Sequence, residues 1–104
     1  MKRKAFIMHL NPGCEEEYAR RHDHIWPELK AELRKAGISD YSIFLDTKTN
    51  TLFAFQHLSD DAAAGGLPNR EIVKKWWHTM KDLMAANPDE SPVCEDLIEV
   101  FHMD

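Results

Sequence analysis

The chain has 104 residues, which allows a single domain over residues 1–104 with one modest hydrophobic core. Its hydrophobic fraction of 43% argues against a disordered chain, and its net charge of −5 disfavours a protein that binds nucleic acid through the phosphates. The apolar run over residues 5–10 is far too short for a signal peptide or a membrane span. We therefore expect a cytoplasmic protein with no membrane partner.

The first third of the chain predicts a strand followed by a long helix. Residues 4–10 are apolar enough for a strand, and Asn11 can cap a helix that is expected to cover about 12–35. Pro27 lies inside this helix and should kink or restart it, because proline removes one backbone donor. Gly37 should end it.

The rest of the chain predicts a hairpin, a helix and a last strand. Strands are expected at 40–45 and 51–58, joined by a polar turn. Ser59-Asp60 can start a short helix, and the clearest helix covers 70–84, where apolar residues recur at helical spacing. The last strand is expected at 97–102.

The order of these elements is β-α-β-β-α-β, which is typical of the ferredoxin-like α+β fold. Two helices can cover only one face of the sheet, yet the first and third strands are apolar at nearly every position. Apolar residues on both faces indicate that the second face is also buried. We expect a homodimer that packs sheet against sheet.

His22 is the ionisable residue that draws attention on the first helix. It follows Tyr18 by one turn, and steps of three and four residues place both on the stripe that should face the sheet. One interpretation is a core histidine with a satisfied hydrogen bond. The other is a general acid or base, because histidine titrates near neutral pH.

Trp76 and Trp77 form a second notable group. Adjacent helical residues point about 100° apart, so the two indoles can hardly fill the same core position. Core packing is one interpretation of the pair. In the other, one indole packs while its neighbour lines a cavity and stacks on the C–H face of a sugar.

Motifs for metals and cofactors are missing from the sequence. His22 and His24 are the one close histidine pair, and on a helix they face different directions. Cys14 and Cys94 have no motif spacing, and we expect free, structural thiols. No glycine-rich phosphate loop stands out. We therefore expect neither a metal nor a cofactor.

Seven stretches, in order and at matching separations, resemble the L-rhamnose mutarotase family along nearly the whole chain. They are Arg3-Lys4-Ala5-Phe6, Tyr18-Ala19-Arg20-Arg21-His22, Ile25-Trp26-Pro27-Glu28-Leu29, Tyr41-Ser42-Ile43, Lys75-Trp76-Trp77, Asn87-Pro88-Asp89 with Ser91-Pro92-Val93, and Glu99-Val100-Phe101-His102. Each stretch is weak by itself, whereas their combination is specific. The segment Ala62–Pro68 carries no signature of the family.

The resemblance implies a dimeric α+β barrel that interconverts the α and β anomers of L-rhamnose without a cofactor. It implies that His22 is the proton donor. The side chains implied to contact the sugar are Tyr18, Tyr41, Trp76 and Trp77. Ring opening and closure by acid–base catalysis needs no redox step, which suits a short chain with histidine, tyrosine and tryptophan.

Two alternatives remain at this point. A cofactor-free monooxygenase on the same barrel would also use histidine, tryptophan and an apolar cavity, and the fold alone does not distinguish it. A non-catalytic sugar-binding module would bind one anomer without accelerating the exchange.

Overall fold

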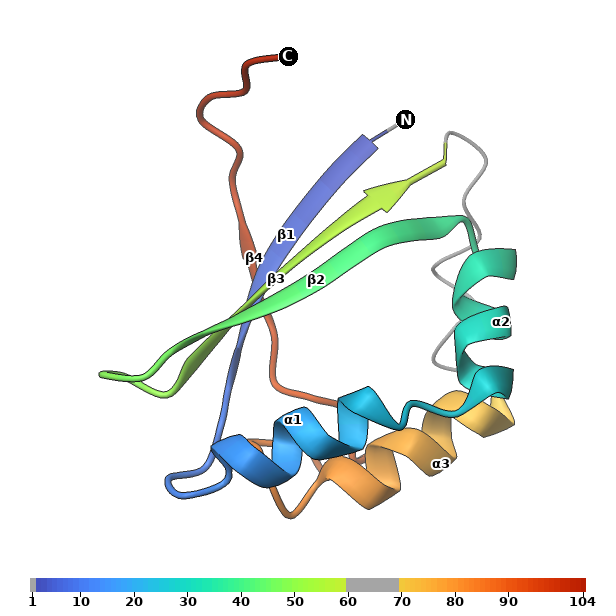
Figure 1. Cartoon of the computed structure of the whole chain (residues 1–104), viewed down its shortest axis with the longest axis vertical. Helices are drawn as coiled ribbons and strands as arrows, with labels where there is room; N and C mark the ends of the chain where they lie inside the picture. The colour runs from blue at the N-terminus through green and yellow to red at the C-terminus, as the bar shows by residue number, and fades with distance from the viewer. Residues whose placement is uncertain (1, 60–69) are drawn as a thin grey trace.

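Residues 2–59 and 70–104 are described in the computed structural model, and they form a four-stranded sheet and three helices (Figure 1). In chain order the elements are β1 (Lys2–His9), α1 (Glu15–Asp23), α2 (Pro27–Lys35), β2 (Ile38–Asp46), β3 (Thr51–Leu58), α3 (Glu71–Met80) and β4 (Glu95–Leu97). The strands lie in the order β2-β3-β1-β4, and neighbouring strands are antiparallel. This topology confirms the predicted ferredoxin-like α+β fold.

The core lies between one face of the sheet and the helices. Alternate residues of β1 and β3 point towards the helices, as the two-residue period of a strand requires. The buried members of this core are Phe6, Met8, Leu10, Tyr18, Leu52, Ala54, Met80, Leu83 and Met84. Helix α2 packs against β2 and α3. The core therefore fixes α1 and α3 against the middle of the sheet.

The opposite face of the sheet is apolar and uncovered in this single chain. Phe44 of β2 and Phe53 of β3 are paired in register, and 68% and 41% of their surfaces are exposed. Ile7 and Phe55 lie on the same face and are half-buried. The apolar pattern predicted on both faces of the sheet is thus present.

The long helix expected over 12–35 is two helices, and Pro27 is the reason. Trp26 has the extended conformation that a residue before proline favours (φ −63°, ψ 129°), and Pro27 then occupies the first turn of α2. The predicted restart at Pro27 is therefore what occurs. Helix α1 begins only at Glu15, because Gly13 first makes a turn with φ 80°.

The last strand is the clearest error of the sequence prediction. It was expected at 97–102, but only Glu95–Leu97 pairs with β1. The following residues, 98–104, here called the C-terminal tail, extend alongside the beginning of β1 and away from the helices (Figure 1). The exposed apolar residues of the tail are Ile98, Val100, Phe101 and Met103. Their apolar pattern is that of a strand, but none of the described strands pairs with them.

The other boundaries lie within four residues of the expected ones. The strand expected at 51–58 has those bounds, and the helix expected over 70–84 ends at Met80. The short helix expected from Ser59-Asp60 lies outside the described residues. Within the described residues, no helix is both long and apolar enough to cross a membrane.

A β-bulge interrupts the pairing of β2 with β3. Ser39 pairs with His57 and Ser42 pairs with Phe55, so β2 has one residue more than β3 over this interval. Asp40 absorbs the irregularity with a left-handed φ of 48°, which aspartate tolerates better than most residues. The bulge places Tyr41 opposite Gln56, on the helix-covered side of the sheet.

Candidate functional site

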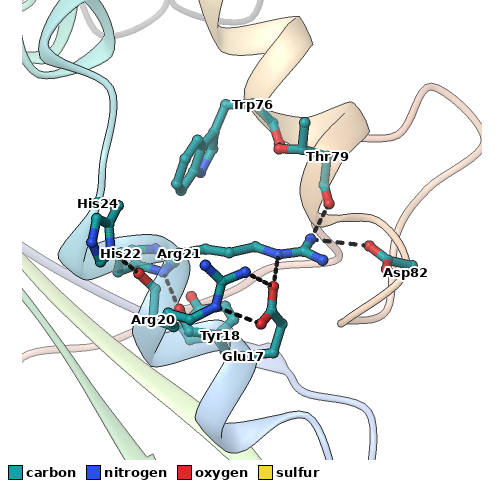
Figure 2. Close-up of polar contacts among 9 residues, drawn as sticks. All are labelled: Glu17, Tyr18, Arg20, Arg21, His22, His24, Trp76, Thr79 and Asp82. Carbon is teal, nitrogen blue, oxygen red and sulfur yellow. Dashed lines mark hydrogen bonds and ion pairs between the residues drawn. The ribbon is translucent and has the colours of Figure 1, made fainter.

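Four aromatic rings from α1, α3 and the link between α1 and α2 lie in a row beside the core. The ring centroids of Tyr18 and His22 are 4.3 Å apart, and those of His22 and Trp76 are 5.4 Å apart. Trp76 meets Trp26 at 5.2 Å. Trp76 extends from α3 towards α1 (Figure 2). The structure therefore brings together His22, Tyr18 and Trp76, three of the five predicted site residues.

The imidazole of His22 has a defined hydrogen bond. Its Nδ1 lies 2.9 Å from the carbonyl oxygen of Tyr18, four residues earlier on α1. Because a carbonyl can only accept, Nδ1 carries the hydrogen and the lone pair of the neutral ring resides on Nε2. Burial among the aromatic rings lowers the pKa of His22 from its ordinary value of 6.5. At neutral pH His22 is thus a base at Nε2.

A set of ion pairs holds the His22 helix against α3 (Figure 2). Arg21 bonds Glu17 at 2.6 Å, donates to the carbonyl oxygen of Thr79, and lies 3.3 Å from Asp82. Glu17 also accepts from Arg20. The hydrogen bonds from Arg20 and Arg21 lower the pKa of Glu17 to about 2, so its carboxylate is charged at neutral pH.

Tyr18 and Tyr41 bring phenol groups to the helix-covered side of the sheet. Burial raises the pKa of Tyr18 well above its usual range. Tyr41 is 37% exposed as a residue, but burial around its hydroxyl raises its pKa to about 12. The two phenol groups and the Cys94 thiol are close enough to influence each other's ionisation. Burial also raises the pKa of Cys94. Both tyrosines are therefore protonated at neutral pH and can donate hydrogen bonds.

Trp77 lies apart from this row of rings. It faces a small hollow beside Met84 and Pro92, on another side of α3. The expectation that the two indoles point in different directions is correct, and Trp76 is the one that adjoins His22.

Trp26 was not predicted as a site residue, although it belongs to the row. The Trp26-Pro27 sequence was the available signal, because a break in the helix frees the preceding side chain to turn inwards. An open hollow of about 410 Å³ borders Trp26. Its lining residues are Trp26, Glu71, Lys74, Lys75, His78 and Thr79.

Metal ligands do not converge in residues 2–59 and 70–104: no three His, Cys, Asp or Glu side chains form a group that could hold an ion. His24 points its Nδ1 to the carbonyl oxygen of Arg20 at 3.0 Å and is exposed. It is therefore no partner of His22. The chemistry that this arrangement offers is proton transfer at a half-buried imidazole beside phenol donors and an indole.

The sequence as a whole matches one family. A family model described as L-rhamnose mutarotase covers residues 3–103. A protein of Bacteroides thetaiotaomicron named L-rhamnose mutarotase is 59% identical over 104 residues, which span 100% of both chains. The similarity therefore extends over all the segments that build the row of rings.

Solved structures give the same result. The crystal structure of L-rhamnose mutarotase from Formosa agariphila superposes with a TM-score of 0.93 and 55% identity, over 100% of both chains. A Chloroflexus aurantiacus protein named for antibiotic biosynthesis monooxygenases superposes with a TM-score of 0.56 at 12% identity, over 99% of this chain and 98% of that one. At this low identity, the similarity to the Chloroflexus aurantiacus protein concerns the fold alone.

Proposed function

The chain belongs to the L-rhamnose mutarotase family, and we propose that His22 carries the proton transfers by which it interconverts the α and β anomers of L-rhamnose. The activity makes it an isomerase that acts on a carbohydrate. The observation that supports the role of His22 is its geometry: Nδ1 is occupied by the Tyr18 carbonyl, and Nε2 is left to exchange protons beside Trp76.

The reaction requires one proton to leave and one to arrive. In the proposed sequence, Nε2 takes the proton of the anomeric hydroxyl, while the bond between the anomeric carbon and the ring oxygen breaks. The electron pair of the broken bond goes to the ring oxygen. That oxygen then receives a proton from the imidazolium of His22. Because both oxygens are bonded to the same carbon, one nitrogen can serve both. The open aldehyde rotates, and closure repeats the steps in reverse.

The aromatic side chains have separate proposed roles around the sugar. Tyr18 and Tyr41 donate hydrogen bonds to sugar oxygens, a role that suits phenols whose pKa values burial raises. Trp76 provides the apolar platform for the C–H face of the sugar. The contact with Trp77 stays a prediction, and its position on another side of α3 favours Trp76 as the platform.

A homodimer is the proposed assembly. The uncovered apolar face around Phe44 and Phe53 needs a partner, and a second copy of the sheet is complementary to it. The C-terminal tail adds four exposed apolar residues at the opposite edge of the sheet, where it continues from β4. An association that covers both surfaces at once is therefore the arrangement that buries most apolar area.

We further propose that residues 1–104 act as one domain in the cytoplasm. The sheet and core formed by the described residues support the first point. Cys14 and Cys94 are free thiols, which suits a reducing compartment.

Saturation transfer between the α and β signals of L-rhamnose in NMR tests the activity. The protein should accelerate the transfer catalytically, and treatment with a strong chelator should leave the rate unchanged, because no step needs a metal. Binding of rhamnose without acceleration would indicate a sugar-binding module. Oxygen uptake with a quinol, and no effect on rhamnose, would indicate the monooxygenase alternative.

A further inference from the structure

Trp76 meets two aromatic neighbours edge to face. The His22 ring lies 5.4 Å from its indole at an interplanar angle of 90°, and the Trp26 ring lies 5.2 Å away at 85°. Edge-to-face pairs at such distances attract each other, because the positive edge of one ring meets the negative face of the other. The Trp76 indole is therefore held by two contacts, one from α1 and one from the link between α1 and α2.

The backbone around Trp26 is fixed on both sides of its side chain. Ile25 donates its N–H to the carbonyl oxygen of His22 at 3.2 Å, and the Trp26 carbonyl oxygen accepts the N–H of Lys30 at 3.1 Å. Pro27 favours the extended conformation that Trp26 adopts, with φ −63° and ψ 129°. The chain therefore presents the indole of Trp26 from a well-defined position.

The surroundings of Trp26 indicate what its indole prevents. Trp26 borders the open hollow of about 410 Å³, whereas Trp76 is not one of the described residues that line it. Both indoles are half-buried. A smaller side chain at position 26 would leave space next to Trp76 that is continuous with the hollow, and the indole could then turn to another rotamer. Such a turn would move Trp76 out of its place beside His22.

We propose that Trp26 is a positioning residue of the mutarotase site, which holds the Trp76 indole beside His22 in the orientation that receives the sugar. This inference rests on the proposed function, in which Trp76 is the platform for the C–H face of the sugar. A platform that is ordered beforehand loses less conformational entropy when the sugar binds. Trp26 acts through Trp76 and need not touch the substrate.

A double-mutant cycle of Trp26→Leu and Trp76→Leu tests the inference. Trp26→Leu should raise the KM for anomer exchange by roughly three- to tenfold, which corresponds to the loss of one aromatic contact. The kcat should change less, because His22 keeps its hydrogen bond to the Tyr18 carbonyl. In the Trp76→Leu background the same change should leave KM unaltered, since no indole remains to be held. Equal effects in both backgrounds, or no effect in either, would overturn the inference.

Two further variants separate orientation from a general loss of packing. Trp26→Phe keeps an aromatic ring at the contact and should hold KM within about twofold of the wild-type value. Leu29→Val removes buried apolar volume from α2, where Leu29 is 3% exposed, and should lower stability without raising KM. If Trp26→Phe or Leu29→Val raises KM as much as Trp26→Leu does, the inference is wrong. Trp26→Met replaces Trp26→Leu in the cycle if that variant does not fold.

Fluorine NMR of protein labelled with fluorotryptophan observes the indoles independently of activity. The chain has three tryptophans, and Trp76→Leu identifies the resonance of Trp76 by its loss. This resonance should be single and narrow in the wild-type protein. In Trp26→Leu it should be broadened or split, because the indole then adopts several orientations. A Trp76 resonance that stays single and narrow in Trp26→Leu would show that the indole keeps its orientation without Trp26, against the inference.

The outcomes distinguish this inference from the proposed function. If wild-type protein accelerates anomer exchange but the cycle is additive, only the role of Trp26 is refuted. If wild-type protein does not accelerate the exchange, both the proposed function and this inference are wrong.

Discussion

The Nδ1 atom of His22 lies 2.9 Å from the carbonyl oxygen of Tyr18, and the rings of the two residues are 4.3 Å apart. Both contacts follow from a spacing of four residues on α1, which stacks one side chain above the other. The hydrogen bond fixes the tautomer of His22 and directs Nε2 away from the helix backbone.

The first prediction concerns the proton carrier. Replacement of His22 by asparagine should lower the rate of anomer exchange by about 10²- to 10⁴-fold, the usual contribution of a positioned acid or base. His24 is a matched control, because its Nδ1 contacts the carbonyl oxygen four residues earlier in the same way, at 3.0 Å, but its side chain is exposed. His24→Asn should keep the rate within about threefold.

Both variants should be compared by NMR saturation transfer at equal concentration of folded protein, checked by circular dichroism. A folded His22→Asn variant with near-normal exchange would assign the proton transfers to another group. Tyr18 and Tyr41 are poor substitutes as bases, since burial raises their pKa values and keeps both phenols protonated.

The second prediction is the pH dependence. Because burial lowers the pKa of His22 below 6.5, the folded protein keeps the basic form to lower pH than a free histidine would. The stability that this group contributes is complete above pH 6.5 and is lost as the pH falls through the folded pKa. The same lowered pKa predicts that kcat/KM falls at acid pH with a midpoint below 6.5. This acid-side fall should be absent in His22→Asn. A midpoint above 6.5 would contradict the effect of burial.

Local patterns in the sequence predicted the parts of the fold that depend on neighbouring residues. The strand at Thr51–Leu58 was predicted with its bounds, because its residues are apolar at nearly every position and a polar turn precedes it. The shared face of Tyr18 and His22 was predicted for a similar reason, since both lie within the unbroken helix α1.

Contacts between distant segments were the parts that the sequence did not reveal. The bulge that redirects Tyr41 depends on how β2 pairs with β3, which no local pattern determines. The expected strand at 97–102 has the apolar pattern of a strand, but β1 pairs only as far as Leu97. Trp26 was missed because its role depends on Trp76, fifty residues later in the chain.

The third prediction distinguishes the two adjacent indoles. Trp76→Leu should weaken rhamnose binding roughly 3- to 10-fold, because the ring next to His22 is the proposed sugar platform. Trp77→Leu should lower thermal stability and leave binding nearly unchanged, since Trp77 is half-buried and lines a small hollow with Met84 and Pro92. Titration of each folded variant with rhamnose, followed by tryptophan fluorescence, measures the affinities. Equal loss of affinity in both would contradict the assignment.

The fourth prediction concerns the brace between α1 and α3. Arg21→Ala should reduce the free energy of unfolding by about 1.5–3 kcal/mol, because it removes charge-assisted hydrogen bonds to Glu17 and to the Thr79 carbonyl from a side chain that is only 26% exposed. It should also raise KM, since His22 and Trp76 belong to the two helices that the brace joins.

Arg20→Ala is the matched control for that brace. Arg20 pairs with the same carboxylate, but its side chain is 63% exposed and the contact stays within α1. The loss of stability should be much smaller than for Arg21→Ala, because exposed pairs within one helix contribute little. Urea denaturation of the two variants measures the difference. Equal effects would show that Arg21 does not hold α3.

The fifth prediction is that the uncovered sheet face joins two copies of the chain. Phe44 is 68% exposed there and pairs in register with Phe53, so a partner sheet would bury both rings. Phe44→Asp places a charge in that interface and should convert a dimer into monomers at micromolar concentration, because an unpaired buried charge is costly. Thr47→Asp introduces the same charge at the exposed turn between β2 and β3 and should leave the dimer intact.

Light scattering on the wild-type protein and both variants gives the molar masses directly. A wild-type monomer at micromolar concentration would refute the assembly, and a Phe44→Asp variant that stays dimeric would show that the interface lies elsewhere.

Removal of residues 100–104 tests the part assigned to the C-terminal tail, because it deletes the exposed side chains of Val100, Phe101 and Met103 without touching the pairing of β4 with β1. Dissociation at a higher protein concentration than for the wild type is the expected result, since the tail would then cover apolar surface of the second copy.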